Sequence, residues 1–145
     1  MDNAERMARG YQYPRVLPEV GEIERVAVTF GYATKDFAPA FLKATLRKPL
    51  ETLSDEIWKN VENTDSLSIT KGDWGAVALI AESHGRDWRM LKEKMEKGQP
   101  IDAPIIVKLG GKFHLVSGNT RLMVARALGV RPRVLVVDMN SLAKK

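Results

Sequence analysis

The 145-residue sequence contains no cysteine and only two histidines. Without cysteine there can be no disulfide bond, no thiol catalysis and no cysteine-ligated zinc or iron–sulfur site. His84 and His114 are 30 residues apart, which is not a spacing at which two side chains bind one metal ion. We therefore expect no metal site in this chain, apart from Mg²⁺ that a bound nucleotide would bring.

Long apolar runs are also missing. The sequence has no stretch of about 18 apolar residues, so it predicts no membrane span. Its N-terminal segment, MDNAERMARG, lacks the apolar core of a secretory signal. We therefore expect a cytoplasmic protein. The hydrophobic content of 44% over 145 residues is enough for one domain with its own core.

Positive charge is concentrated toward the C-terminus. Eight basic residues and one acidic residue lie from Lys108 onward, a net charge of +7, whereas 15 basic and 17 acidic residues before it give −2. This distribution favours an anionic partner such as a nucleotide, DNA or RNA. We expect the surface that binds this partner to include Lys112, Arg126, Arg131 and Arg133. The alternative is a solvated basic surface without a partner.

The N-terminal half gives the weaker structural signals. Residues 1–20 are aperiodic and predict an irregular N-terminal arm. Alternating apolar residues predict a strand over 23–30, and a helix-like pattern follows over residues 36–48 despite Pro39. Thr52 and Asp55 have the spacing of a capping box at the start of a further helix.

Two helices in tandem are predicted between residues 73 and 98. Asp73 and Asp87 are the expected N-caps, and Gly85 and Gly98 the expected ends. A helix-turn-helix unit is an alternative interpretation of this pair, although no residue marks a recognition helix. We expect the tryptophans to anchor helix packing rather than to stack on bases; they are Trp58, Trp74 and Trp88.

The strongest pattern lies in the last third of the chain. Residues 103–109 predict an apolar strand, Gly110-Gly111 a hairpin turn and residues 112–118 the returning strand, on whose surface we expect His114. An apolar helix follows over 119–129, and a Val-rich strand after it has the composition of a buried sheet position. The sequence therefore predicts an α/β (α+β) fold, a single domain over residues 21–145 with a small mixed sheet and the N-terminal helices packed around it.

Polar residues gather at the start of the helix over 119–129, which is otherwise apolar. The first N–H groups of a helix have no partner within it, and the helix dipole makes this end positive. Gly118 allows a ligand to approach the backbone, and Asn119 or Thr120 can cap an N–H group or bond a ligand oxygen. Arg121 adds a cation with the geometry to bind phosphate. We predict a phosphate site formed by Ser117, Gly118, Asn119, Thr120 and Arg121.

Arg121 itself needs a compensating partner. A cation in the first turn opposes the helix dipole at a cost of about 0.3–1 kcal/mol. A bound anion would offset this cost, and so would a salt bridge to a nearby carboxylate. The first alternative makes Arg121 a ligand-binding residue, and the second makes it structural.

The segment PIIVKLGGKFHLVSGNTRLMVARALGVRPRVLVVDM resembles the ParB/sulfiredoxin domain superfamily. It shares with that family an apolar strand that begins Pro-Ile, a tight turn, a Ser-Gly followed by x-x-Arg at a helix start, and a closing Val-rich strand. The resemblance covers about residues 99–139, or 87–139 with the preceding helix. It implies a ParB/sulfiredoxin-like fold in which the turn at Gly118–Arg121 contacts the phosphates of ATP or CTP with Mg²⁺.

Known branches of this superfamily include CTP-dependent partition proteins, sulfiredoxins, a free-serine kinase branch and proteins described as nucleases. Sulfiredoxin chemistry requires a cysteine in the turn, where this chain has Asn119. Only a short tail follows the final strand, so we do not expect a full partition protein. Asn119-Thr120 also replaces the histidine or glutamate that many relatives carry there, and so this chain departs from activities that need that side chain.

Three functions fit these features. The first is an ATP-dependent phosphotransferase (kinase) or NTPase that acts on or near nucleic acid, for which Arg121 and a carboxylate base would be catalytic. Glu82 is preferred as that base over Asp87, Asp102 and Asp138. The second is a non-catalytic DNA- or nucleotide-binding module, such as an accessory protein of a phage or mobile element. The third is an interaction protein that keeps the fold without the chemistry.

Overall fold

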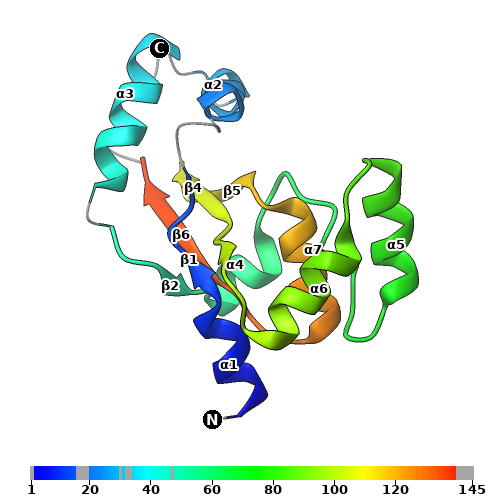
Figure 1. The fold of residues 1–145 in the computed structure, drawn as a ribbon. Helices are drawn as coiled ribbons and strands as arrows, with labels where there is room; N and C mark the ends of the chain where they lie inside the picture. The colour runs from blue at the N-terminus through cyan, green and yellow to red at the C-terminus, as the bar shows by residue number, and fades with distance from the viewer. Residues whose placement is uncertain (1, 16–19, 30, 32–33, 47, 140–145) are drawn as a thin grey trace.

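The computed structural model describes residues 2–15, 20–29, 31, 34–46 and 48–139, in which helices surround a small sheet (Figure 1). The helices are α1 (Asn3–Arg9), α2 (Val20–Thr29), α3 (Thr34–Thr45), α4 (Asp55–Asn60), α5 (Trp74–Ser83), α6 (Trp88–Lys97) and α7 (Asn119–Leu128). The strands are β1 (Tyr11–Gln12), β2 (Glu51–Thr52), β3 (Ile101–Asp102), β4 (Ile105–Leu109), β5 (Lys112–Ser117) and β6 (Arg133–Asp138). The predicted α/β class is confirmed.

The main sheet has the strand order β2-β6-β4-β5. Strand β4 pairs antiparallel with β5 and parallel with β6, with Ile105 opposite Leu135. Gly110 and Gly111 form the β4–β5 turn with φ of 56° and 77°, values that favour glycine. The chain then crosses through α7 and returns as β6, which is buried along its four central residues. The hairpin, the helix and the buried final strand are therefore confirmed.

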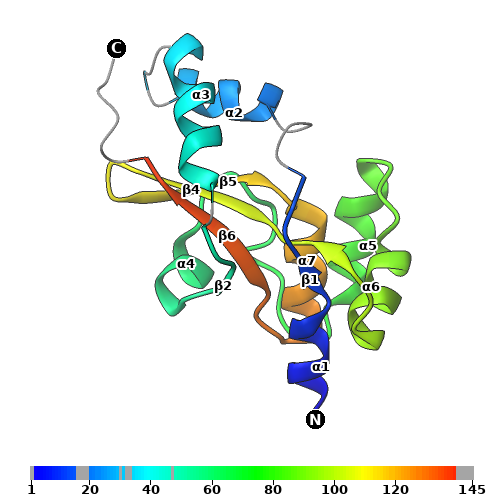
Figure 2. The ribbon, with the colours of Figure 1, turned by 60° about the vertical axis from the view of Figure 1, so that its left-hand side comes forward.

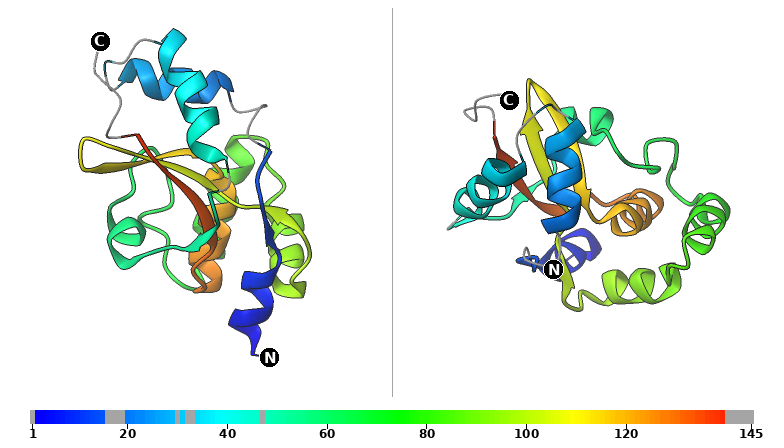
Figure 3. Two further views of the ribbon diagram at one scale, coloured as in Figure 1. Left: turned by 90° about the vertical axis from the view of Figure 1, so that its left-hand side faces the viewer. Right: turned by 90° about the horizontal axis from the view of Figure 1, so that it is seen from above.

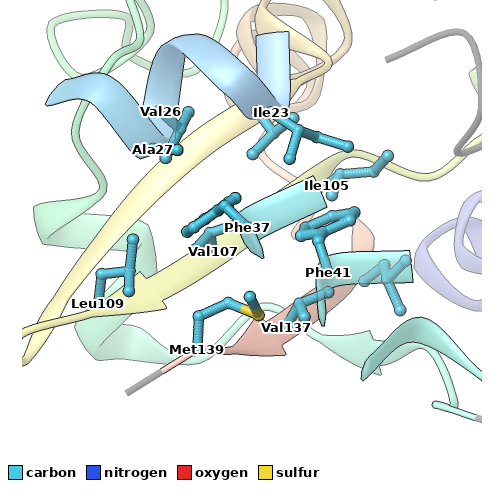
Figure 4. Packing of buried hydrophobic residues seen from close by; sticks show 12 residues of the cluster. Ile23, Val26, Ala27, Phe37, Phe41, Ile105, Val107, Leu109, Val137 and Met139 are labelled. Atoms are coloured by element: carbon cyan, nitrogen blue, oxygen red, sulfur yellow. The ribbon is translucent and has the colours of Figure 1, made fainter. Parts of the chain in front are cut away.

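Helices cover both faces of this sheet. Figure 2 shows α2 and α3 on one face and α4 and α7 on the other. Alternate residues of β4 explain this, because Ile105 and Val107 pack with Phe37 and Phe41 of α3 (Figure 4), whereas Ile106 packs on the opposite face. Helices α5 and α6 lie on the side of α7 away from the sheet (Figure 3). Helix α7 is thus packed from two sides, which explains its apolar sequence.

Residues 20–29 form a helix, so the predicted strand over 23–30 is wrong. Ile23, Val26 and Ala27 are buried, with the i, i+3, i+4 spacing of one helix face. Val28, which a strand would have buried together with Val26, is 67% exposed. The alternation of valines was therefore incidental to a helical pattern. Residue 30, the end of the predicted strand, lies outside the described residues.

Residues 3–12 are regular, which corrects the predicted irregular arm. Asp2 accepts a hydrogen bond from the Glu5 backbone and caps α1. Strand β1 pairs in parallel with β3, where Gln12 donates to the Asp102 carboxylate at 2.8 Å. Burial opposes ionisation of Asp102, but hydrogen bonds from Gln12 and Arg15 outweigh it and lower the pKa of this carboxyl. Strand β3 is some 90 residues from β1 in the sequence, so no local sequence pattern predicts that the two strands pair.

The predicted helix ends are mostly confirmed. Asp73 caps α5, Asp87 caps α6, and Gly98 ends α6 with φ 68°. Helix α4 is capped by Ser54 instead of Thr52. Among the described residues no helix is both long and apolar enough to cross a bilayer.

The three tryptophans lie on helices, as predicted. Trp74 of α5 and Trp88 of α6 stack with ring centroids 5.7 Å apart. The ring of Trp58 on α4 lies against the buried guanidinium of Arg126, 4.1 Å from its centroid. These contacts join α5 to α6 and α4 to α7, which is the packing role expected of large aromatic side chains.

Candidate functional site

Helix α7 begins directly where β5 ends, at Gly118. This residue has φ 108°, in the left-handed region that favours glycine. A Cβ atom here would lie 2.9 Å from the Cβ and 3.0 Å from the Cα of Pro104. Glycine is therefore required both by the backbone conformation and by the close approach of the neighbouring segment. The turn it makes fixes the direction in which the start of α7 points.

The N-cap of α7 is Gly118, which makes no side-chain capping hydrogen bond. The other helices with a described N-cap each have one, in which a side-chain oxygen accepts from the first turn: Asp2 on α1, Ser54 on α4, Asp73 on α5 and Asp87 on α6. Neither Asn119 nor Thr120 caps α7, although either residue type could. The N–H groups of Asn119 and Thr120, the first two residues of α7, are therefore placed to bind an anion.

Asn119 instead holds the loop that follows α4. Its Oδ1 accepts from the Thr64 hydroxyl at 2.7 Å and from the Asp65 backbone N–H at 2.9 Å. Its Nδ2 donates to Asp65 Oδ2 at 3.0 Å. Asp65 is therefore fixed beside the start of α7 by both ends of one amide side chain.

Arg121 is tethered to the segment between β3 and β4. Its Nη1 donates to the carbonyl of Asp102 at 2.5 Å and to that of Ala103 at 3.5 Å, while Nη2 donates to Ser117 Oγ at 2.9 Å. These oxygens offset the cost of a cation in the first turn. Ser117 and Arg121 thus have a structural role as well as a place in the site. Burial raises the pKa of Tyr11, and the nearby charge of Arg121 opposes this.

A cavity of about 980 Å³ opens at the start of α7. It is lined by residues 117–121, by the loop over 63–65, by the joint between α5 and α6, and by Glu22 of α2. All five residues predicted for the phosphate site line it: Ser117, Gly118, Asn119, Thr120 and Arg121. The structure therefore brings the predicted group together at one cavity.

Charged residues of both signs line this cavity. The carboxylates are already engaged: Asp65 with Asn119, Asp87 as the cap of α6, and Glu22 with Arg25 at 3.1 Å. Arg86 differs, because its exposed side chain forms no ion pair with any described residue. Arg86 is thus a cation at the cavity that is available to a ligand.

Sequence reasoning missed Asp65 and Arg86, and it did not place His84 in the site. Asp65 meets Asn119 across 54 residues of sequence, so no local pattern joins them. For His84 and Arg86 the only signal in the sequence was the short joint Gly85-Arg86 between α5 and α6. A joint this short keeps both residues close to the end of α5 and the start of α6.

Glu82, the carboxylate predicted as a base, lies outside the cavity lining. Its side chain is on α5 and pairs with Arg89 at 3.8 Å. Asp87 and Asp102 were among the alternative bases considered from the sequence. Asp87 lines the cavity, whereas the Asp102 carboxylate contacts Gln12 and Arg15 of the N-terminal segment.

The predicted basic surface is not one continuous patch. Arg126 is 6% exposed, so its assignment to that surface is wrong; it donates to Ser66 Oγ and to the Trp58 carbonyl. Lys112 opens β5 and pairs with Glu62, whereas Arg133 opens β6 at the opposite end of the sheet. Arg131 pairs with Asp55. Burial of the cationic arginine lowers the pKa of Arg126 to about 10.

His114 is buried rather than on a strand surface, which corrects that prediction. It is 9% exposed, because residues 62–63 cover the edge of β5. Burial lowers the pKa of its imidazole, and the charges of Glu62 and Glu22 oppose the change.

We compared the chain with known proteins. No protein-family model, no curated protein and no solved structure matches it. The assignment of a function therefore rests on the residues and the geometry described above.

Proposed function

We propose that this chain is a ParB-like nucleotide-binding domain that holds the phosphates of ATP or CTP at the start of α7. The observation that carries the proposal is the uncapped N-terminus of α7, which faces a polar cavity of about 980 Å³. The N–H groups of Asn119 and Thr120 would donate to phosphate oxygens, and the helix dipole favours the negative charge. Arg86, at the joint between α5 and α6, would add a cation from the lining of the same cavity.

The proposed reaction is transfer of the terminal phosphoryl group to a hydroxyl or to water. Such a reaction depends on positioning and on neutralising the charge of the phosphates. Among the described residues no group of three or more His, Cys, Asp or Glu side chains could hold a metal ion. Mg²⁺ would enter bound to the nucleotide phosphates and neutralise their charge, while Arg86 and the α7 N–H groups would orient them.

A non-catalytic binding module is the second candidate. The side chain of Asn119 is committed to Thr64 and Asp65, so it is not placed to act on a substrate. This favours a site that holds a nucleotide without turnover. Lys112 and Arg133 lie at opposite ends of the sheet, so these cations do not support one continuous nucleic-acid surface in either candidate.

We expect MgATP or MgCTP to raise the melting temperature, and Arg86→Gln to weaken that effect. A ligand at 100 times its Kd stabilises a protein by about 2.7 kcal/mol. Losing a hydrogen bond to a charged group costs about 1.5–3 kcal/mol, so the Kd of Arg86→Gln should rise at least about tenfold. Arg86 is a better test than Arg121, whose removal would also release its carbonyl partners.

The matched control is Arg89→Gln. Arg89 is also an exposed arginine, three residues further along, but it pairs with Glu82 and does not line the cavity. Its variant should bind nucleotide as the wild type does. If neither nucleotide stabilises the wild type, or if the two variants bind equally well, the proposal is wrong. Release of phosphate would favour the enzyme over the binding module.

A further inference from the structure

His84 and Asp65 meet at the cavity wall from two separate segments. His84 follows the last residue of α5, and Asp65 lies in the loop after α4. Nε2 of His84 is 3.6 Å from Oδ2 of Asp65, and both side chains line the same cavity as the start of α7. This distance is longer than a hydrogen bond. In structures without a bound ligand, the distance between two catalytic groups is often this long and shortens when the ligand binds.

Asp65 is held in place by a chain of hydrogen bonds that begins at a buried cation. Nε of Arg126 donates to Ser66 Oγ, which is 2.8 Å from the Thr64 hydroxyl. Because Oδ1 of Asn119 can only accept, Thr64 gives its one proton to it. Asn119 in turn donates to Asp65 Oδ2. The carboxylate thus has a fixed orientation toward His84, although both groups are about half exposed.

We propose that His84 is the general base of the phosphoryl transfer and that Asp65 is the residue that positions it. Closing the 3.6 Å separation to hydrogen-bond distance would place Nε2–H on the Asp65 carboxylate and leave Nδ1 as the ring nitrogen that accepts a proton. The other carboxylates of the cavity are less suited, because Asp87 accepts from the Met90 backbone and Glu22 pairs with Arg25. This inference rests on the proposed function.

The step balances without any further reactant. His84 takes the proton of an acceptor hydroxyl, from water or an alcohol, while that oxygen forms a bond to the γ-phosphorus. The bond from the γ-phosphorus to the oxygen that bridges it to the β-phosphate breaks, and its electron pair stays on the nucleoside diphosphate. The imidazolium then releases its proton to solvent.

The test measures MgATP binding and phosphate release on the same preparations of the full chain. General bases contribute about 10²–10⁴-fold to a rate, so His84→Gln should lower kcat by at least about 100-fold and leave KM within about twofold. Asp65→Asn should also lower kcat, by a smaller factor. Free imidazole should restore part of the kcat of His84→Ala, because the native side chain is 57% exposed and its position can be reached from solvent. Glu51→Gln, on the distant strand β2, is the control for loss of a carboxylate, and it should leave both MgATP binding and kcat unchanged.

The outcomes separate this inference from the proposal on which it rests. Binding with turnover that falls in His84→Gln and is partly restored by imidazole in His84→Ala supports both. If the wild type binds MgATP but His84→Gln releases phosphate at the wild-type rate, or if no phosphate is released at all, the role of His84 is overturned and the binding site stands. If the wild type does not bind MgATP, both are overturned.

Discussion

Replacing Gly118 with alanine is expected to destabilise the protein by about 2–5 kcal/mol and to abolish nucleotide binding. The left-handed conformation costs a residue with a Cβ roughly 1–2 kcal/mol, and overpacking adds typically about 1–3 kcal/mol. The added methyl group would meet the Cα and Cβ of Pro104 at 3.0 and 2.9 Å. One of the two segments must then move, and the start of α7 moves with it. Urea unfolding measures the first effect and nucleotide titration the second.

Gly111→Ala is the matched control for this change. Gly111 also has positive φ, 77°, but among the described residues, apart from its chain neighbours, no atom lies within 4 Å of the position of its Cβ. Its replacement should cost only the conformational term of roughly 1–2 kcal/mol and should leave nucleotide binding unchanged. Equal losses of stability in the two variants would show that the contact with Pro104 has no energetic weight.

Arg126→Ala is expected to lower the free energy of unfolding by about 2–5 kcal/mol. The guanidinium supplies hydrogen bonds to Ser66 and to the Trp58 carbonyl, and it lies over the Trp58 ring. Each hydrogen bond of a charged group contributes about 1.5–3 kcal/mol and a desolvated cation–π contact about 2 kcal/mol, and because contacts of one side chain are not additive the expected loss is smaller than their sum. Truncation would also leave the buried oxygens of its partners without a donor. Because Ser66 connects to Thr64 and Asn119, the same variant should weaken nucleotide binding.

Arg131→Ala provides the comparison for Arg126. Arg131 lies near the same Trp58 ring, at 5.9 Å, but its side chain is 39% exposed and pairs with Asp55 at the surface. Exposed pairs of this kind contribute up to about 1 kcal/mol. Denaturant unfolding measures the free energy of unfolding of both variants. If Arg126→Ala lowers it no more than Arg131→Ala does, the buried role assigned to Arg126 is wrong.

The C-terminal part of the fold is predictable from sequence because its signals are local. Gly110-Gly111 marks the hairpin, Gly129 ends α7 with φ 74°, and the valines of β6 indicate a buried strand. Helix α2 was missed because Val26 and Val28 alternate as in a strand, whereas the buried helix face consists of Ile23, Val26 and Ala27. The β1–β3 pairing was missed because its partners are distant in the chain, and only the fold brings them together.

The candidate site likewise has one part that local sequence patterns predict and another that depends on tertiary packing. The residues at 117–121 are contiguous, so a strand, a glycine and a helix start were enough to find them. Asp65, His84 and Arg86 come from two other segments, and their place at the cavity depends on how α5 and the loop after α4 pack against α7. Arg126 looks like a surface cation in the sequence, and only the packing of α4 on α7 shows it to be buried.

The backbone amides of α7 provide the most direct test of the central claim, that phosphates bind at the start of this helix. Nuclear magnetic resonance can follow each amide while MgATP or MgCTP is added to the wild-type protein. Phosphate binding at the start of α7 should give saturable shifts that are largest at the N–H groups of Asn119 and Thr120, with smaller ones near Arg86. Shifts that are centred elsewhere, or amides of α7 that do not respond while the nucleotide binds, would contradict it.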